Sequence, residues 1–184
     1  MRLFAALPVV GEARLELERR LAGYRREEWP VKWVGDNGLH VTTKFLGEVG
    51  AGQVDAVRSV LREASTGTPP LPLLPTELGA FPNFIRARVL WAGYESEAAL
   101  ELMVHRIEQA TGGLGFPLEG RPFRPHVTLG RLNEGATLPA EGAERLQHDK
   151  LSAGFIADRL VLYQSRSGTA GSTYSEVDSF PLGS

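Results

Sequence analysis

The segment His40-Val41-Thr42 recurs 86 residues later as His126-Val127-Thr128, and each copy begins a strand-like run of residues. Alternate residues of a β-strand face the same side, so each histidine shares a face with the threonine two residues on. An imidazole gains or loses a proton close to neutral pH. Two imidazoles aimed at one groove, each backed by a hydroxyl, are suited to protonating one side of a bond while accepting a proton on the other. The paired motif therefore predicts general acid/base catalysis.

A purely structural role competes with this interpretation. A single histidine on a strand is more often a partly buried residue that hydrogen-bonds the backbone than a catalytic one. Two copies of His-x-Thr in equivalent local surroundings are poorly explained by packing, so we prefer the functional interpretation. The remaining two of the four histidines carry no such signal, because His105 lies off the apolar stripe of its helix and His148 lies in a polar segment. We expect both on the surface.

Regular elements surround both motifs. Residues 2–8 resemble a strand, and helical spacing of apolar residues predicts a helix from Glu12 to Arg26 and another after the first motif. Arg86 to Tyr94 is predicted as a strand, followed by a third helix. The three apolar stripes are Ala13, Leu17, Leu21 and Tyr24, then Val54, Val57, Leu61 and Ala64, then Leu100, Met103, Val104 and Ile107.

Strand, helix and His-x-Thr strand therefore occur twice. An offset of 86 aligns Arg2–Ala6 with Arg88–Ala92 as well as one histidine with the other. This weak repeat predicts two pseudo-symmetric lobes whose histidines face each other across a groove. We assign one bilobal domain over residues 1–184, with motif halves of roughly 1–66 and 86–132.

The two halves are joined and completed by less regular segments. The proline-rich stretch from Thr66 to Pro75 suits an extended segment or a joint between lobes. Residues 133–152 are interpreted as a surface insertion with a short helix near Glu141–Gln147. C-terminal strands are predicted within residues 154–180, at Phe155–Tyr163 and Tyr174–Phe180.

Composition limits the remaining possibilities. The 184 residues are 42% hydrophobic and 23% charged, which is ordinary for a globular protein with a core. The absence of cysteine excludes disulfides, thiolate metal sites and a cysteine nucleophile. No apolar run approaches the roughly 20 residues that span a bilayer, and Met1–Pro8 is too short for a signal peptide. We expect a cytoplasmic protein without membrane contact. With a net charge of −2, any contact with nucleic acid must be local.

The two motifs and their flanks resemble the paired signatures of the two-histidine phosphoesterase superfamily. Within it, the chain is most similar to the bacterial and archaeal RNA 2',3'-cyclic phosphodiesterases, once called 2'-5' RNA ligases. The resemblance covers nearly the whole chain. It is carried by Met1–Phe4, His40–Gly47, Gly79–Asn83, Arg88–Gly93, Phe123–Arg131, Leu160–Ser165 and Phe180–Leu182.

The resemblance implies an α+β, bilobal fold in which pseudo-two-fold duplicated halves form a central cleft from antiparallel sheets, with helices packed outside. It implies metal-independent opening of a terminal 2',3'-cyclic phosphate of RNA to a 2'-phosphate, with reverse 2'-5' ligation open to the same site. It assigns His126 as the water-activating base and His40 as the acid, although the residues alone do not order them. Thr42 and Thr128 would hydrogen-bond phosphate oxygens, and Arg131 would contact the phosphate.

No cofactor is expected, and a metal site is disfavoured because neither motif supplies a carboxylate or second histidine at ligand spacing. The expected partner is an RNA with a 2',3'-cyclic phosphate end or a related nucleotide, and the expected state is a monomer. Arg86 and Arg124 are weaker candidates for RNA contact.

Strict alternation makes further predictions about three residues that flank the motifs. It places Lys44 on the face of His40, where it could attract phosphate or simply be solvated, and it places Phe45 in the core. It also places Arg131 on the face opposite His126, unless Gly130 permits a bulge that redirects the arginine.

Two other functions remain open from the sequence. The same chemistry could act on a small cyclic nucleotide or an ADP-ribose cyclic phosphate, in which case the cleft would close around one nucleotide instead of extending beyond it. Alternatively, the chain could bind RNA ends without turning them over, although intact histidine and threonine in both motifs argue against that role.

Overall fold

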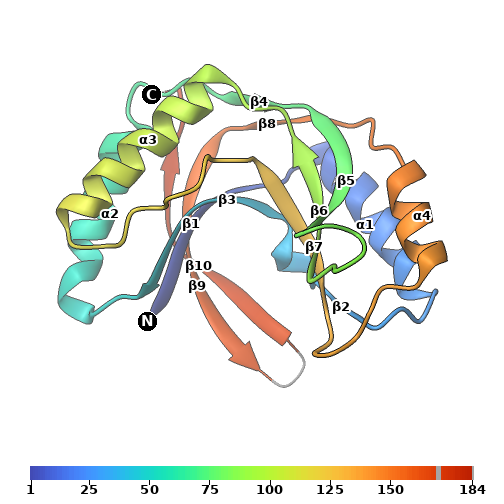
Figure 1. Cartoon of the computed structure of the whole chain (residues 1–184). Coiled ribbons are helices and arrows are strands. Elements are labelled where there is room, and N and C mark those ends of the chain that lie inside the picture. The colour runs from blue at the N-terminus through green and yellow to red at the C-terminus, as the bar shows by residue number, and fades with distance from the viewer. Residues whose placement is uncertain (169–170, 184) are drawn as a thin grey trace.

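The computed structural model describes residues 1–168 and 171–183 and contains a curved sheet with helices on its convex side (Figure 1). The strands are β1 (Arg2–Pro8), β2 (Val31–Trp33), β3 (His40–Glu48), β4 (Leu71–Leu73), β5 (Pro75–Phe81), β6 (Val89–Tyr94), β7 (His126–Leu132), β8 (Phe155–Ala157), β9 (Arg159–Gly168) and β10 (Gly171–Pro181). The helices are α1 (Gly11–Arg25), α2 (Val54–Ser65), α3 (Ala98–Gly113) and α4 (Ala140–His148), with short 3-10 turns η1 (Asp36–Gly38) and η2 (Ala51–Gln53).

The main sheet is antiparallel and joins the two halves of the chain. Its strand order is β10-β9-β1-β3-β7-β6-β5, and β2 pairs with β7. A separate two-stranded sheet contains β4 and β8. Strands β9, β1 and β3 therefore lie on one side of the β3–β7 junction, and β6 and β5 lie on the other. The predicted α+β class with antiparallel sheets is confirmed.

The helices bury the apolar stripes that the sequence predicts. Every residue of the three stripes is buried, and the stripes merge with one face of the sheet in a continuous core. On β1 this face carries Leu3, Ala5 and Leu7. The opposite face of β1 carries Phe4 and Ala6, which belong to a small separate apolar cluster with Val161 and Tyr163. The sheet thus has a helix-covered face and a second face that also holds the two His-x-Thr motifs.

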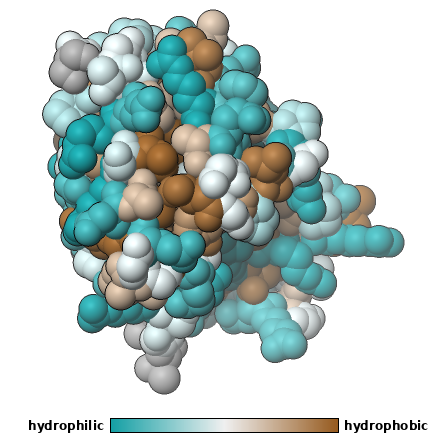
Figure 2. All heavy atoms as spheres, turned by 90° about the vertical axis from the view of Figure 1, so that its left-hand side faces the viewer, coloured by the Kyte–Doolittle hydropathy of each residue, from teal (hydrophilic) through white to brown (hydrophobic). Residues whose placement is uncertain are grey.

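The outer surface of the helix layer is mixed. In Figure 2, which views the left-hand side of Figure 1, hydrophilic side chains predominate and surround a group of apolar ones near the centre. Leu102 on α3 and Leu118, which follows α3 in the chain, are exposed apolar residues, at 50% and 61%. No helix within the described residues is both long enough and apolar enough to cross a membrane.

The pairing of strands shows the internal repeat, but the predicted offset is wrong by one residue for the first strand of each half. Phe4 pairs with Phe45 and Ala6 with Thr42, whereas Val89 pairs with Arg131 and Trp91 with Thr128. The motif strands are therefore related by an offset of 86, but β1 and β6 are related by an offset of 85. The alignment of Arg2–Ala6 with Arg88–Ala92 is wrong by one position, because strand registers and not residue similarity determine the equivalence.

Residues 133–152 are more than a surface insertion. Helix α4 forms where the short helix was predicted, but Leu138 and Leu146 are buried in the main core. Gly142 lies so close to the Trp29 ring that an added Cβ would come within 2.9 Å of it. Downstream, the predicted strand Phe155–Tyr163 is divided into β8 and β9, which belong to different sheets.

Candidate active site

Both His-x-Thr motifs lie at the junction between β3 and β7. Val41 pairs with Val127 in antiparallel register, and both valines are fully buried on the helix-covered face. Continuing this register by one residue each way places His40 beside Thr128 and Thr42 beside His126. The two histidines are then diagonal neighbours, which in a regular ladder lie roughly 7–8 Å apart. The junction therefore brings both motifs together on the open face of the sheet.

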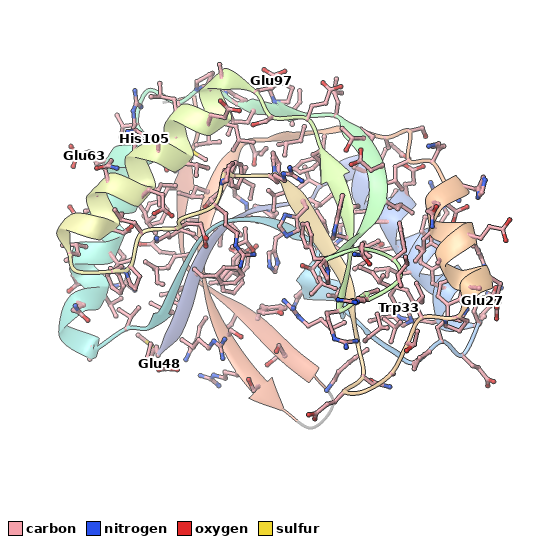
Figure 3. The ribbon with its side chains drawn as sticks, in the orientation of Figure 1. Glu27, Trp33, Glu48, Glu63, Glu97 and His105 are labelled. Carbon is pink, nitrogen blue, oxygen red and sulfur yellow. The ribbon has the colours of Figure 1, made fainter. Side chains whose placement is uncertain are left out.

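The surrounding side chains gather beneath this junction. Figure 3 shows side chains projecting into the space between the central strands and the β9–β10 hairpin, whereas His105 lies on the outer side of α3. His105 and His148 are both exposed, as predicted. Arg86 and Arg124 are also exposed. Among the described residues, no three His, Cys, Asp or Glu side chains are grouped closely enough to hold a metal ion.

Each motif strand contains a bulge at the same place. The register skips one residue between Thr42 and Lys44 in β3, and one residue between Thr128 and Gly130 in β7. The extra residues are Thr43 and Leu129, which are equivalent in the repeat. The Thr43 hydroxyl donates a hydrogen bond to the carbonyl of Ala5 at 3.0 Å and so compensates for the interrupted ladder. Because a bulge reverses the alternation that follows it, the next residues exchange faces.

The bulge in β3 overturns the predictions for Lys44 and Phe45. Lys44 turns toward the helices, is 5% exposed, and its Nζ lies 2.9 Å from the Glu108 carboxylate. Phe45 is not a core residue, because 68% of its surface is exposed on the face that carries His40. Its ring centroid lies 6.0 Å from that of Phe4.

The bulge in β7 decides the position of Arg131. Strict alternation predicts the face opposite His126, and this prediction is wrong because Leu129 provides the bulge. Arg131 pairs with Val89, two residues before Trp91, and is exposed on the histidine face. Arg131 and Phe45 therefore occupy equivalent positions, five residues after their histidines. One half of the site presents a cation and the other an aromatic ring.

A backbone hydrogen bond fixes the orientation of the His126 ring. Its Nδ1 lies 2.7 Å from the carbonyl oxygen of Arg124. Because a carbonyl only accepts, Nδ1 carries the proton and Nε2 of the neutral ring is left as an acceptor. The ring contacts Phe81 edge-on at 5.2 Å and Trp91 at 6.3 Å between centroids. A fixed imidazole with an available Nε2 is suited to act as a general base.

His40 is enclosed by aromatic rings. Its centroid lies 4.9 Å from that of Phe4, 5.5 Å from that of Tyr163 and 5.2 Å from that of Tyr174. Burial lowers the pKa of His40 from 6.5 to about 4, and the nearby backbone of Asn37 opposes this lowering only in part. Its Nδ1 is buried and makes no hydrogen bond within the described residues. The free protein therefore holds His40 neutral at pH 7, and a bound anion would favour its protonated form.

The half-buried, neutral His40 makes stability depend on pH. Between pH 6.5 and about 4 the unfolded chain binds a proton that the folded chain excludes, so stability falls as the pH decreases through this range. The difference corresponds to about 3 kcal/mol. Comparing the free energy of unfolding in urea at pH 7.5 and 4.5, we expect the wild type to lose about 2 kcal/mol more than His40→Gln. Equal losses in both proteins would contradict the burial of a neutral imidazole.

The aromatic residues around the histidines were not found from the sequence. Phe4, Tyr163 and Tyr174 belong to three strands that only the folded sheet brings together. No local sequence pattern therefore predicts that they lie around His40. For Phe45 a signal was present. Its spacing from His40 equals the spacing of Arg131 from His126, and the repeat alone could have paired the two positions.

Comparisons with known proteins find relatives that share a name. A protein of Geobacillus stearothermophilus named RNA 2',3'-cyclic phosphodiesterase is 30% identical over 181 residues, which cover 97% of this chain and 56% of that protein. The chain thus spans little more than half the length of that relative. A protein of the same name from Methanothermobacter thermautotrophicus is 27% identical over 184 residues, covering 99% of both chains.

The fold is shared with a solved structure. A crystal structure of a protein from Thermus thermophilus matches with a TM-score of 0.83 at 24% identity, covering 99% of this chain and 98% of that one. The family model for the 2'-5' RNA ligase superfamily matches residues 13–169. Since this match covers most of the sequence, the chain belongs to the 2'-5' RNA ligase superfamily.

Proposed function

We propose that the protein hydrolyses a terminal 2',3'-cyclic phosphate of RNA to a 2'-phosphate. The observation that carries the proposal is the pairing of Val41 with Val127, which sets two His-x-Thr motifs on one open face of the sheet. The names of the relatives in Geobacillus and Methanothermobacter support the same activity. Both motifs come from one chain, so the proposed site is complete without a second copy.

In this proposal, His126 is the general base and His40 the general acid. Nε2 of His126 accepts a proton from the attacking water, and His40 donates a proton to the departing 3'-oxygen. Thr42 and Thr128 donate hydrogen bonds to the non-bridging phosphate oxygens, where negative charge increases in the transition state. Arg131 adds a positive charge on the same face. By microscopic reversibility the same groups, with exchanged roles, would catalyse 2'-5' ligation.

The low pKa of His40 fits this assignment once substrate is included. The free histidine, with a pKa of about 4, is a poor acid at neutral pH because little of it is protonated. A cyclic phosphate bound between Thr42 and Thr128 places a negative charge beside the imidazole and raises its pKa. His40 would therefore take up its proton as the substrate binds.

A direct assay tests the proposal. Purified protein is incubated in excess EDTA with an RNA oligomer that ends in a 2',3'-cyclic phosphate, and the product is identified by mass and by phosphatase sensitivity. Conversion to a 2'-phosphate is expected. Turnover of only a cyclic mononucleotide or an ADP-ribose cyclic phosphate would establish the small-nucleotide alternative. Tight binding of the oligomer without turnover would establish an RNA-end-binding protein instead.

Phe45 is proposed as a stacking platform for the terminal base. An exposed aromatic ring beside an RNA end typically stacks on a base, and such a contact is worth about 1–3 kcal/mol. We expect Phe45→Ala to lower kcat/KM on a cyclic-phosphate RNA end by about tenfold, and Phe45→Tyr to retain most of it. Leu102→Ala, which shortens an exposed residue on the outer side of α3, is the matched control. A substrate with an abasic terminal ribose should show no difference between Phe45→Ala and the wild type.

A further inference from the structure

A pocket adjoins the aromatic shell of His40. It has a volume of about 480 Å³, within the range of about 300–1,000 Å³ that is typical of small-molecule sites. The turn before β3, the start of α1 and the paired strands β9 and β10 form its walls. Its lining includes Arg14, Asn37, Arg159, Tyr163, Tyr174 and Glu176.

The pocket lies beside the proposed active site. Tyr163 and Tyr174 line the pocket and also contact the His40 ring, so each contributes to both spaces. Asn37, which lies three residues before His40, lines the pocket as well. The pocket therefore borders the His40 end of the proposed active site.

The pocket offers guanidinium groups that can contact a phosphodiester. Two guanidinium groups, from Arg14 and Arg159, line the pocket together with the Glu176 carboxylate. Ion pairs hold both arginines at the pocket wall: Arg14 lies 2.8 Å from Glu18, and Arg159 lies 3.2 Å from Glu176. A second pocket of about 310 Å³ shares Arg14 and is also lined by Glu18 and Arg25. Guanidinium groups bind phosphate with directed hydrogen bonds.

We propose that this pocket binds the nucleotide that precedes the cyclic-phosphate terminus of an RNA substrate. Aromatic walls accommodate a base or ribose, and the arginines accommodate the phosphodiester that links the two nucleotides. The inference rests on the proposed function and makes it more specific. The substrate is then an RNA chain of at least two nucleotides, and a cyclic mononucleotide leaves the pocket empty.

Two substrates of different length test the inference. The wild type is assayed with a mononucleoside 2',3'-cyclic phosphate and with a dinucleotide that carries the same cyclic end. We expect kcat/KM for the dinucleotide to be higher by at least about tenfold, the effect of one charge-assisted phosphate contact. Equal values would overturn the inference and leave the proposed function intact. Turnover of neither substrate would overturn both.

Two variants test whether this pocket causes the preference for the dinucleotide. Arg14→Gln removes one guanidinium group, and Val10→Trp fills the pocket; the Val10 side chain makes no capping hydrogen bond to α1 that would be lost. In both, the ratio of dinucleotide to mononucleotide kcat/KM should fall toward one. Arg19→Gln, an exposed substitution on the same helix, is the matched control and should keep the wild-type ratio. A wild-type ratio in both pocket variants would place the preference elsewhere and overturn the inference.

Discussion

Replacing either His40 or His126 with alanine is expected to lower kcat for opening of a 2',3'-cyclic phosphate by about 10²–10⁴-fold, the usual contribution of one general acid or base. The double variant should lose little beyond the more damaging single change, because the two groups act in one step. His105→Ala, on the outer side of α3, is the matched control and should turn over normally.

The acid and the base can be separated by changing the leaving group. A thiol leaves with a pKa near 8.5, far below that of an alcohol, and needs no protonation. With a substrate whose 3'-bridging oxygen is replaced by sulfur, His40→Ala should regain much of its activity, whereas His126→Ala should stay inactive. Rescue of His126→Ala instead would reverse the assignment of acid and base. Wild-type rates in both variants on the natural substrate would exclude the two-histidine mechanism.

The two histidines and their threonines could be predicted because their signal is local. A two-residue spacing puts His and Thr on one face of any strand, and the repeat supplies the second pair. The apolar stripes of α1, α2 and α3 were predictable for the same reason, since each depends on spacing within one element. The motif spacing does not predict which residues pair where the two halves meet. In the structure, Val41 of β3 pairs with Val127 of β7.

The faces of the residues that follow the motifs could not be predicted from alternation. One extra residue, Thr43 in β3 or Leu129 in β7, exchanges the faces of the side chains that follow it, and in β3 a second register shift at Leu46 reverses them again. None of these residue types marks a bulge. A glycine is the residue type that typically permits a bulge, but the bulge that redirects Arg131 lies at Leu129, one residue before Gly130. The pocket beside His40 could not be predicted from the sequence either, because α1, η1 and β10 contribute to it from distant parts of the chain.

The exchange of faces at the β3 bulge leaves Lys44 in a buried ion pair, and its loss is expected to be costly. Nζ of Lys44 donates to the Glu108 carboxylate at 2.9 Å and to the carbonyl of Pro117 at 2.6 Å. The exposed fractions of the Lys44 and Glu108 side chains are 3% and 16%. Lys44→Met would leave the carboxylate with the backbone N–H of Glu119 as its remaining hydrogen bond within the described residues. We expect the free energy of unfolding to fall by about 3 kcal/mol or more.

The physical reason is desolvation, and a second substitution tests it. A charge taken out of water without its partner is strongly destabilising, whereas replacing both partners by apolar residues is often nearly neutral. The double variant Lys44→Met with Glu108→Leu should therefore recover most of the stability that Lys44→Met loses. Lys150→Met, at an exposed lysine, should change the free energy of unfolding by no more than about 0.5 kcal/mol. If urea unfolding showed additive losses in the double variant, the pair would not be coupled, and the link from β3 to α3 would rest on packing alone.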